Sequence, residues 1–361
     1  MFHQILNPAG NLGATVALSG SVGKVVAVLA LLPPWVLIYL VAGRRGFRDG
    51  WPLAIVGSFA YILGQYPTSQ FLGPYLPDII GSIVCFAALL ALLKLWKPRT
   101  VLGFGGTPIE EGGPSRESSS SGLSATEIVS AWTPIAILII VVVAWTGPWS
   151  PLPDVSLFTL EVDARSALGN QTVASAFSFA PFIGGTAILA SWLAMLAFLR
   201  PDTRILKQVF TRTFTQMWGA LLVGVFIFGL AYVFIYSGMS TSLAYGFSRI
   251  GPAFIVLAPI LGWIGVALSG SNTSTNTMFG AVQATAGKLL GLPILLTPTL
   301  NSVGAEVGKP VAPQTSSVGV STSRFVRNEG EVIWHNMGWT LVLLAYLILI
   351  GLLYYFFAPD L

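Results

Sequence analysis

The chain has 361 residues, 54% of them hydrophobic and 9% charged, with a formal net charge of +4. A soluble globular domain carries roughly 25% charged residues, so this chain lacks the polar side chains needed to cover itself with a water-exposed surface. Its Lys and Arg residues lie in short loops rather than in a basic stripe with interleaved aromatics, which argues against nucleic acid as a partner. Cys85 is the only cysteine, which excludes an internal disulfide and a cysteine-based metal cluster.

Apolar blocks long enough to cross about 30 Å of hydrocarbon as helices recur along the chain. Backbone groups in lipid must be satisfied within the element itself, so these blocks are predicted to be helices. The predicted fold class is therefore all-α, a polytopic transmembrane helical bundle. The predicted spans cover residues 25–41, 51–65, 79–96, 128–146, 174–199, 214–238 and 337–357.

Several features add detail to these spans. Pro33 and Pro34 lie inside the first block and predict a kink, because each proline removes one backbone hydrogen bond. Residues 200–213 mix basic and apolar side chains, and predict either a helix along the membrane surface or an ordinary extension of the next span. In the last block, Leu347 is predicted to face outward. The first residues carry no basic segment followed by an apolar one, so no cleaved signal peptide is expected.

The composition changes sharply over residues 100–126, where Gly, Ser, Glu and Pro predominate and apolar periodicity is absent. Such a composition is typical of a flexible linker. We expect an N-terminal transmembrane bundle of about three spans over residues 1–99 and a cytoplasmic linker over residues 100–126. Residues 127–361 are then expected to form a C-terminal transport repeat.

Basic residues follow alternate spans, and loops rich in Lys and Arg stay on the cytoplasmic side of a membrane. The alternation is consistent only if residues 251–290 enter and leave on the same outer side while residues 291–322 cross. We therefore predict a re-entrant hairpin over residues 251–290 and a broken helix over residues 291–322. The basic residues are Arg44, Arg45, Arg48, Lys94, Lys97, Arg99, Arg200, Arg204, Lys207, Arg212, Arg324 and Arg327.

Residues 269–277 form an unbroken run of small polar residues between apolar helices. Such a run is costly at membrane depth unless it lines a cavity. Because Ser, Thr and Asn cap helices, a helix that begins near residues 274–277 would direct free N–H groups at an anion. The alternatives are an external loop, or hydroxyls bonded back to carbonyls of their own helix. The candidate substrate-binding residues are Ser271, Asn272, Thr273 and Asn276.

Residues 301–317 contain glycines and prolines that rule out one continuous helix, while residues 315–317 are suited to cap a second half-helix. Lys309 would attract a carboxylate, and Glu306 is either its ion-pair partner or a proton carrier. The alternative is a cytoplasmic loop with both charges solvated. Paired broken segments point to the binding site of a transporter. Further candidate substrate-binding residues are Asn301, Gly308, Lys309, Gln314 and Thr315.

Motifs of other protein classes are missing from the sequence. It contains no nucleotide-binding loop, zincin helix or nucleophile elbow. We therefore expect neither an enzyme nor a bound cofactor or metal.

Three stretches together resemble the bacterial L-lactate permease family, whose members also carry glycolate. They are GQYPTSQFLGPYLPDII at residues 64–80, SGSNTSTNTMFGAVQAT at residues 269–285 and NSVGAEVGKPVAPQTSS at residues 301–317. The resemblance covers roughly residues 25–357. It implies a secondary transporter of the bacterial inner membrane that moves a monocarboxylate with a proton. It also implies a fold similar to that of ion transporters with paired hairpins and broken helices.

The sequence departs from this family pattern in two ways. Family versions often have Asp where this chain has Asn272, and lack an acid where this chain has Glu306. The acid that couples transport to protons is therefore expected at a different position. Family members are also longer at the N-terminus, so this chain is either a fragment or a reduced relative.

These observations predict a lactate or glycolate permease in which the polar run binds the carboxylate and Glu306 is the proton site. Its expected partners are the small carboxylate, protons and the lipid bilayer, and a homodimer is compatible with the pattern. Two alternatives stay open. One is a sodium-coupled carrier of dicarboxylates or tricarboxylates, and the other is a fragment or scaffold that does not transport.

Overall fold

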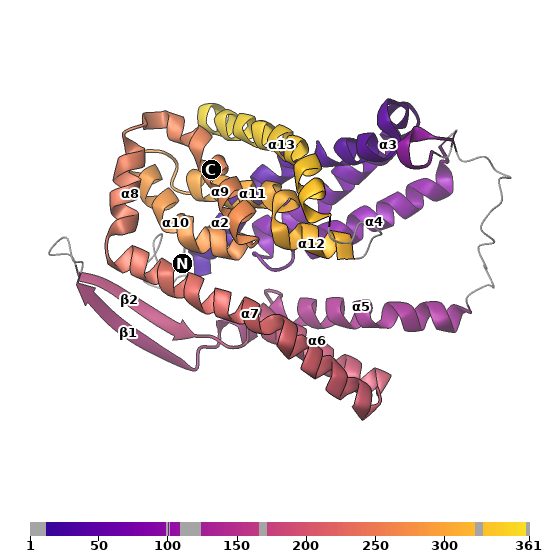
Figure 1. Cartoon of the computed structure of the whole chain (residues 1–361), viewed down its shortest axis with the longest axis horizontal. Helices are drawn as coiled ribbons and strands as arrows, with labels where there is room; N and C mark the ends of the chain where they lie inside the picture. Colours follow the sequence, from indigo (N-terminus) through magenta and orange to yellow (C-terminus); the bar gives the residue numbers. More distant parts are fainter. Residues whose placement is uncertain are drawn as a thin grey trace. The chain divides into compact units, whose positions relative to one another are not determined.

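A computed structural model describes residues 12–98, 100, 102–108, 124–165, 172–321 and 328–358. The chain divides into two compact units, and Figure 1 labels their helices and strands. The first consists of Ala30–Leu160 and Ser178–Thr213 and is called the α3–α6 unit. The second consists of Met1–Leu29, Glu161–Phe177 and Phe214–Leu361 and is called the α9–α13 unit.

In the α3–α6 unit, α3 packs against α4 and α5 packs against α6. The α3–α4 contact is close because glycines face each other, and a Cβ on Gly64 would lie 2.7 Å from the Cα of Gly81. A break at Gly43, with φ 60 and ψ −154, interrupts α3. The helices are α3 Pro33–Phe71, α4 Pro77–Leu95, α5 Ala125–Thr146 and α6 Gly184–Leu199, with short 3-10 turns η1 Phe104–Gly106 and η2 Leu152–Asp154.

The first predicted span, residues 25–41, is wrong as a single helix. The helix α2 Leu12–Leu29 ends within it, and α3 begins at Pro33. Pro33 and Pro34 therefore start a helix instead of kinking one, because the first turn of a helix leaves its N–H groups unused. The α2 helix begins earlier than predicted because its Gly and Ser residues lower its apparent hydrophobicity.

Residues 174–199 are also not one span. They begin in the strand β2 Thr172–Phe179, which pairs with β1 Phe158–Arg165, and only α6 is helical. A parallel pair needs a crossover of a dozen or more residues, so strands joined by residues 166–171 pair antiparallel. The sequence FTLEVDAR alternates apolar and polar residues, which is the period of a strand.

The predicted helical class is confirmed apart from this strand pair. Within the described ranges, six helical stretches are long and apolar enough to cross a membrane. One of them lies in α7 Thr203–Tyr236, a single continuous helix. Residues 203–213 are therefore an extension of the following span, the second of the two interpretations given above.

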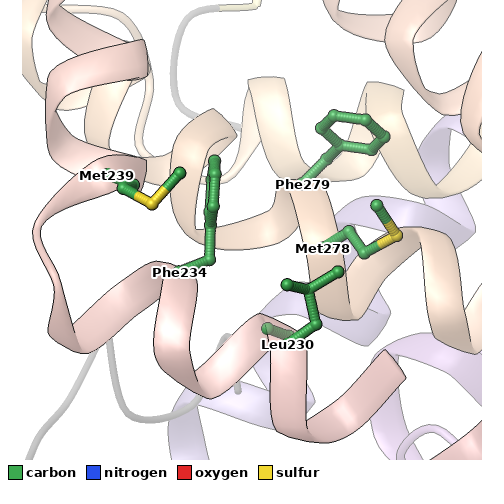
Figure 2. A pocket seen from close by; sticks show the side chains of 6 residues that line it. Leu230, Phe234, Met239, Met278 and Phe279 are labelled. Carbon is green, nitrogen blue, oxygen red and sulfur yellow. The ribbon is translucent and has the colours of Figure 1, made fainter. Parts of the chain in front are cut away.

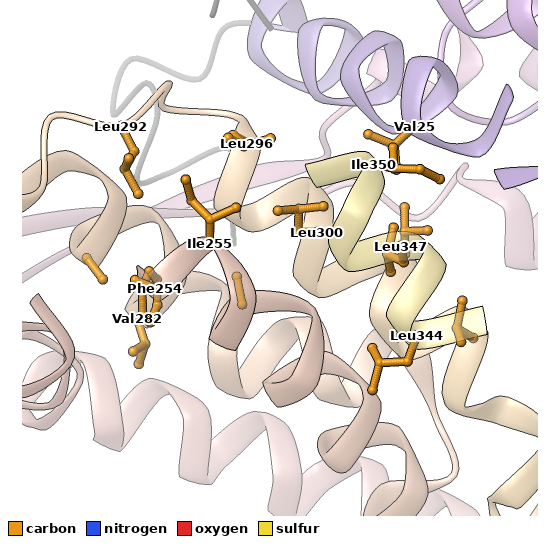
Figure 3. Packing of buried hydrophobic residues seen from close by; sticks show 14 of the residues in the cluster. Val25, Phe254, Ile255, Val282, Leu292, Leu296, Leu300, Leu344, Leu347 and Ile350 are labelled. Carbon is orange, nitrogen blue, oxygen red and sulfur yellow. The ribbon is translucent and has the colours of Figure 1, made fainter. Parts of the chain in front are cut away.

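The α9–α13 unit has a buried apolar core built around α9, α11 and α13 (Figure 3). Phe254, Leu300 and Leu347 are among its largest buried side chains. The prediction that Leu347 faces outward is wrong, because hydropathy marks a span without telling which of its faces packs against protein. The helices are α2, the second part of α7, α8 Met239–Ser248, α9 Phe254–Ser269, α10 Asn272–Leu289, α11 Leu296–Gly308, α12 Pro313–Ser321 and α13 Glu329–Phe357, with 3-10 turns η3 Gly251–Ala253 and η4 Lys309–Val311.

The helices α9 and α11 approach each other at backbone distance. A Cβ on Gly262 would lie 2.0 Å from the carbonyl oxygen of Asn301, and a Cβ on Gly304 would lie 2.3 Å from that of Pro259. No side chain fits between them at these positions. Glycine is therefore required on both helices, and the contact fixes where Asn301 lies.

The predicted linker falls largely outside the described residues. Within its described part, Leu102 and Pro108 form a β-bridge, and Gly106 lies against the backbone carbonyl of Ala42 in α3. The compact units have other bounds than residues 1–99 and 127–361. The predicted division into an N-terminal bundle, a linker and a C-terminal repeat stays a prediction.

Candidate binding site at the ends of α10, α11 and α12

The polar run forms the turn between α9 and α10 and the first turns of α10. Gly270, with φ +70, ends α9, and the backbone there adopts the left-handed region that favours glycine. The Ser271 hydroxyl caps α10 by accepting from the Ser274 N–H at 3.2 Å. The helix thus begins at Asn272, earlier than the predicted residues 274–277. The remaining free N–H groups of its first turn give this end positive character.

The second polar segment is also broken. The helix α11 ends at Gly308, η4 follows, and α12 begins at Pro313. The residues predicted to cap α12, 315–317, lie inside it, because Pro313 already supplies a preorganised first position. A Cβ on Gly270 would lie 2.7 Å from the side-chain amide of Gln314. The N-terminal ends of α10 and α12 therefore meet at the Gly270 turn.

A chain of side-chain hydrogen bonds joins α10 to α11 beside this turn. The Asn272 Nδ2 donates to the Glu306 carboxylate oxygen Oε1. The Asn276 Nδ2 donates to Asn272 Oδ1 at 2.9 Å and to Ser302 Oγ at 3.1 Å. The Asn301 Nδ2 donates to Asn276 Oδ1 at 2.9 Å. Four residues predicted for the site from two distant polar stretches thus lie in one network.

The network continues into the core through Gln283, which the sequence reasoning missed. Its side chain is 0% exposed, and its Nε2 donates to Asn301 Oδ1 and to the Ala258 carbonyl, each at 3.2 Å. The Thr297 hydroxyl donates to the Gln283 backbone carbonyl at 2.8 Å. The available signal was its spacing, because Gln283 follows Asn276 at a separation that returns to the same helix face.

Glu306 lies between two helix ends whose dipoles act on its charge in opposite directions. It is exposed in the last turn of α11, where the helix dipole disfavours a negative charge, but its partner Asn272 opens α10, where the dipole favours one. Lys309, exposed in η4, makes no ion pair with it in the part of the chain that the structure describes. The ion-pair role proposed for Glu306 is therefore not formed here.

Other predicted residues lie outside the network. Thr273 on α10 and Thr315 on α12 are exposed. Gly308 packs against α9, where its Cβ would lie 2.6 Å from Val266 Cγ1 and 3.0 Å from Trp263 Cδ1. The buried Trp263 Nε1 has no hydrogen-bond partner among the described residues. An unused N–H donor is thus present close to the break after α11.

A cavity of about 220 Å³ lies on α10 near this site, but its chemistry is different (Figure 2). Its lining is apolar and comes from α7, α8 and α10. A carboxylate placed there would lose its hydration without gaining hydrogen-bond donors, which costs several kcal/mol or more. The cavity is therefore not the place for an anionic ligand. Its lining residues are Leu230, Ala231, Phe234, Met239, Met278 and Phe279.

Broken helices whose polar ends meet in a multi-pass helical protein are typical of the binding sites of membrane transporters. The family model of L-lactate permease matches residues 5–359, so the chain belongs to the L-lactate permease family. With its apolar helices, this membership makes it a multi-pass protein of the bacterial inner membrane. The family assignment made from the three polar stretches is thus confirmed.

Curated relatives give the same result. The glycolate permease GlcA of Escherichia coli K12 is 30% identical over 92% of this chain and 63% of its own length. The L-lactate permease of the same strain is 29% identical over 86% of this chain and 59% of its own. That of Bacillus subtilis 168 is 28% identical over 93% of this chain and 64% of its own. The chain thus spans less than two thirds of the length of each of these relatives.

Among solved structures, the YdaH transporter of Alcanivorax borkumensis is similar to the chain with a TM-score of 0.40. The sequences are 17% identical, and the match covers 99% of this chain and 83% of that one.

Proposed function

We propose that the chain carries a small monocarboxylate, L-lactate or glycolate, across the inner membrane together with a proton. Family membership and the names of the relatives support the substrate class. One observation carries the mechanism: an amide N–H of Asn272, at the N-terminal end of α10, already holds a carboxylate, that of Glu306. A donor group that binds one carboxylate is suited to bind another.

The substrate carboxylate would bind where α10 and α12 begin. The backbone N–H of Thr273 and the side-chain amides of Asn272 and Gln314 lie at this end, and two helix N-termini favour a negative charge without a buried cation. Ser271 fixes the start of α10. Asn276 donates a hydrogen bond to Asn272, and Asn301 donates one to Asn276, so the two residues hold the Asn272 side chain in place. The exposed Lys309 adds attraction at longer range.

Glu306 would couple this binding to a proton. When ionised, Glu306 occupies the Asn272 donor, and a second carboxylate placed beside it meets like-charge repulsion. Protonation removes that charge, so substrate and proton bind together more readily than substrate alone. This arrangement favours the symport of a monocarboxylate with one proton.

The predicted membrane topology belongs to the same proposal. The helices α9 and α10 would form the re-entrant hairpin of residues 251–290, and α11 and α12 the broken helix of residues 291–322. In a Cys85→Ser background, single cysteines at the exposed positions Ile250 and Ile294 should react with an impermeant reagent from the same face of the membrane. Reaction from opposite faces would disprove the hairpin.

Uptake into proteoliposomes tests the function. The purified chain should accumulate labelled lactate and glycolate when the interior is alkaline, and a protonophore should abolish the accumulation. Empty liposomes and liposomes with the Asn272→Leu variant are the controls. Accumulation of succinate or citrate driven by a sodium gradient would replace this proposal with the sodium-coupled alternative. Absence of transport for all these substrates would support the scaffold alternative.

A further inference from the structure

We propose that Gln283 is a positioning residue that links the direction of the amide hydrogen bonds in the site to the protonation state of Glu306. Gln283 belongs to no predicted site, and the proposal rests on the function proposed above. It is derived from the direction of five consecutive hydrogen bonds and from one buried oxygen atom that has no partner.

The donor-to-acceptor direction of this chain of hydrogen bonds is fixed at both of its ends. A backbone carbonyl only accepts, so the Ala258 carbonyl obliges Gln283 to present its Nε2. An ionised carboxylate also only accepts, so Glu306 obliges Asn272 to present its Nδ2. Between these ends, every amide donates toward Glu306, from Gln283 to Asn301, from Asn301 to Asn276 and from Asn276 to Asn272.

Because the groups at both ends of this hydrogen-bond chain only accept, one acceptor within the chain is left without a donor. Gln283 uses its Nε2 for both neighbours, and its own Oε1 is buried without a partner among the described residues. Such an orphaned acceptor is unfavourable, since it has lost its water and gained no donor. An ionised Glu306 at one end of the hydrogen-bond chain is thus accompanied by an unpaired, unfavourable Gln283 Oε1 at the other end.

Protonation of Glu306 supplies the missing donor. A proton taken from water by the exposed carboxyl turns Glu306 into an O–H donor toward Asn272 Oδ1. Rotation of the intervening amides then lets Asn272 donate to Asn276, and Asn276 to Asn301. Asn301 Nδ2 in turn reaches Gln283 Oε1, while Gln283 Nε2 keeps its bond to the Ala258 carbonyl. In this reversed chain every amide is satisfied.

Gln283 therefore stabilises the protonated form of the site from the interior of the bundle. Once Glu306 is neutral, its charge no longer repels a carboxylate at the start of α10. The backbone N–H groups of the first turn and the second N–H of the Asn272 amide are then available to the substrate carboxylate. The amide chain thus couples binding of the substrate to protonation of Glu306, although no proton moves along the amides.

Other charges near Glu306 would act on the same equilibrium. The elements packed against α11 are α2, α9, α10, α13 and η4. Within the described ranges, no ion pair joins Glu306 to any of them, and α9 contains no titratable side chain. The titratable groups on the other four elements are Lys24, Lys288, Lys309, Glu329, Glu331, His335, Tyr346, Tyr354 and Tyr355.

The test compares Gln283→Met with Thr297→Val in lactate counterflow measured as a function of pH. Both variants remove one buried hydrogen-bonding group from the α10–α11 contact, but only Gln283→Met removes the end of the chain. Without Gln283, the protonated state loses its extra hydrogen bond. The pH midpoint of substrate affinity should therefore move to lower pH by about one unit, the shift that one orphaned acceptor produces. Thr297→Val should keep the wild-type midpoint.

A wild-type midpoint in Gln283→Met, or an equal shift in both variants, overturns the proposal and leaves Gln283 a purely structural residue. A wild-type protein that transports neither lactate nor glycolate overturns the proposed function instead. If Gln283→Met does not fold, infrared difference spectra of the wild type across the pH midpoint give the answer. Reversal predicts a change in the side-chain amide carbonyl bands that disappears in Glu306→Gln. Identical amide spectra for these two proteins would refute the reversal.

Discussion

Of the six candidate spans within the described ranges, α4 and α5 in one unit and α9 and α13 in the other are covered by protein to very different extents, while the span in α7 is 6% buried. In the α3–α6 unit, 6% of the span in α4 and 0% of the span in α5 are buried within the protein. In the α9–α13 unit, the corresponding shares are 39% for the span in α9 and 28% for the span in α13. All four stretches have a similar mean hydropathy, between 2.0 and 2.4.

Spans of similar hydropathy therefore belong to two kinds of helix, one with outward-facing apolar side chains and one packed against protein. In α4 and α5 the apolar side chains turn outward, as expected where lipid takes the place of water. In α9 the burial comes from glycines that admit another backbone and from the polar network behind them. Function is expected in the second kind, because buried polar groups are kept only where they are satisfied or used.

The largest expected effect comes from filling the α9–α11 contact. Gly262→Ala places a Cβ at 2.0 Å from the Asn301 carbonyl oxygen, so the two helices must separate. We expect a loss of about 3 kcal/mol in the free energy of unfolding, the upper end of the usual cost of overpacking, together with loss of transport. Gly229→Ala on α7 is the matched control, since nothing lies within 4 Å of its Cβ position. Equal thermal stability of the two variants in detergent would show that the contact is not tight.

The second prediction separates the site from the fold. Asn272→Leu removes the donor to Glu306 and the acceptor for Asn276 at a half-buried position, without touching the apolar core. Lactate uptake should fall to the background of empty liposomes, while membrane insertion and the unfolding midpoint stay near wild type. The control is Leu349→Val, at a side chain that is 50% exposed. Normal uptake by Asn272→Leu would reduce the polar run to a structural role.

These two cases also show what the sequence can predict. The polar residues at the site were found because a run of Ser, Thr and Asn between apolar helices is conspicuous, and Asn272, Asn276, Asn301 and Glu306 do meet. Gln283 was missed because it lies beyond the conspicuous polar run, and only its seven-residue spacing from Asn276 connects it to the site. The break before Pro33 was missed because a window average cannot locate the end of a helix.

The third prediction concerns the charges of the site and is smaller, since it alters coupling rather than binding. Glu306→Gln mimics the protonated carboxyl at the same size, so counterflow exchange should persist while net uptake loses its response to a pH gradient. Because Glu306 and Lys309 make no ion pair in the described structure, their effects should add. Proton-driven accumulation that survives Glu306→Gln would place the coupling group elsewhere. A double variant with Lys309→Met that departs strongly from additivity would show that the two charges act as a unit.

The smallest effect is expected in α5, and this prediction is the most direct test of the comparison between the units. Ile140 is 66% exposed and contacts little protein, so Ile140→Ala should change the free energy of unfolding by less than about 0.5 kcal/mol. Leu347→Ala in α13, at a side chain that is 0% exposed, should cost about 2 to 5 kcal/mol, since it leaves a cavity in the core.

The two variants remove a similar apolar volume from spans of similar hydropathy, so the difference between them measures protein contact alone. Thermal unfolding in detergent at several protein concentrations provides the measurement. A large loss in Ile140→Ala would mean that protein, rather than lipid, covers this face of α5. If that loss grew on dilution, a second copy of the chain would be the covering partner, because the stability of a dimer depends on its concentration. The homodimer anticipated from the sequence would then have its interface on α5, which has the lowest buried share of the six candidate spans within the described ranges.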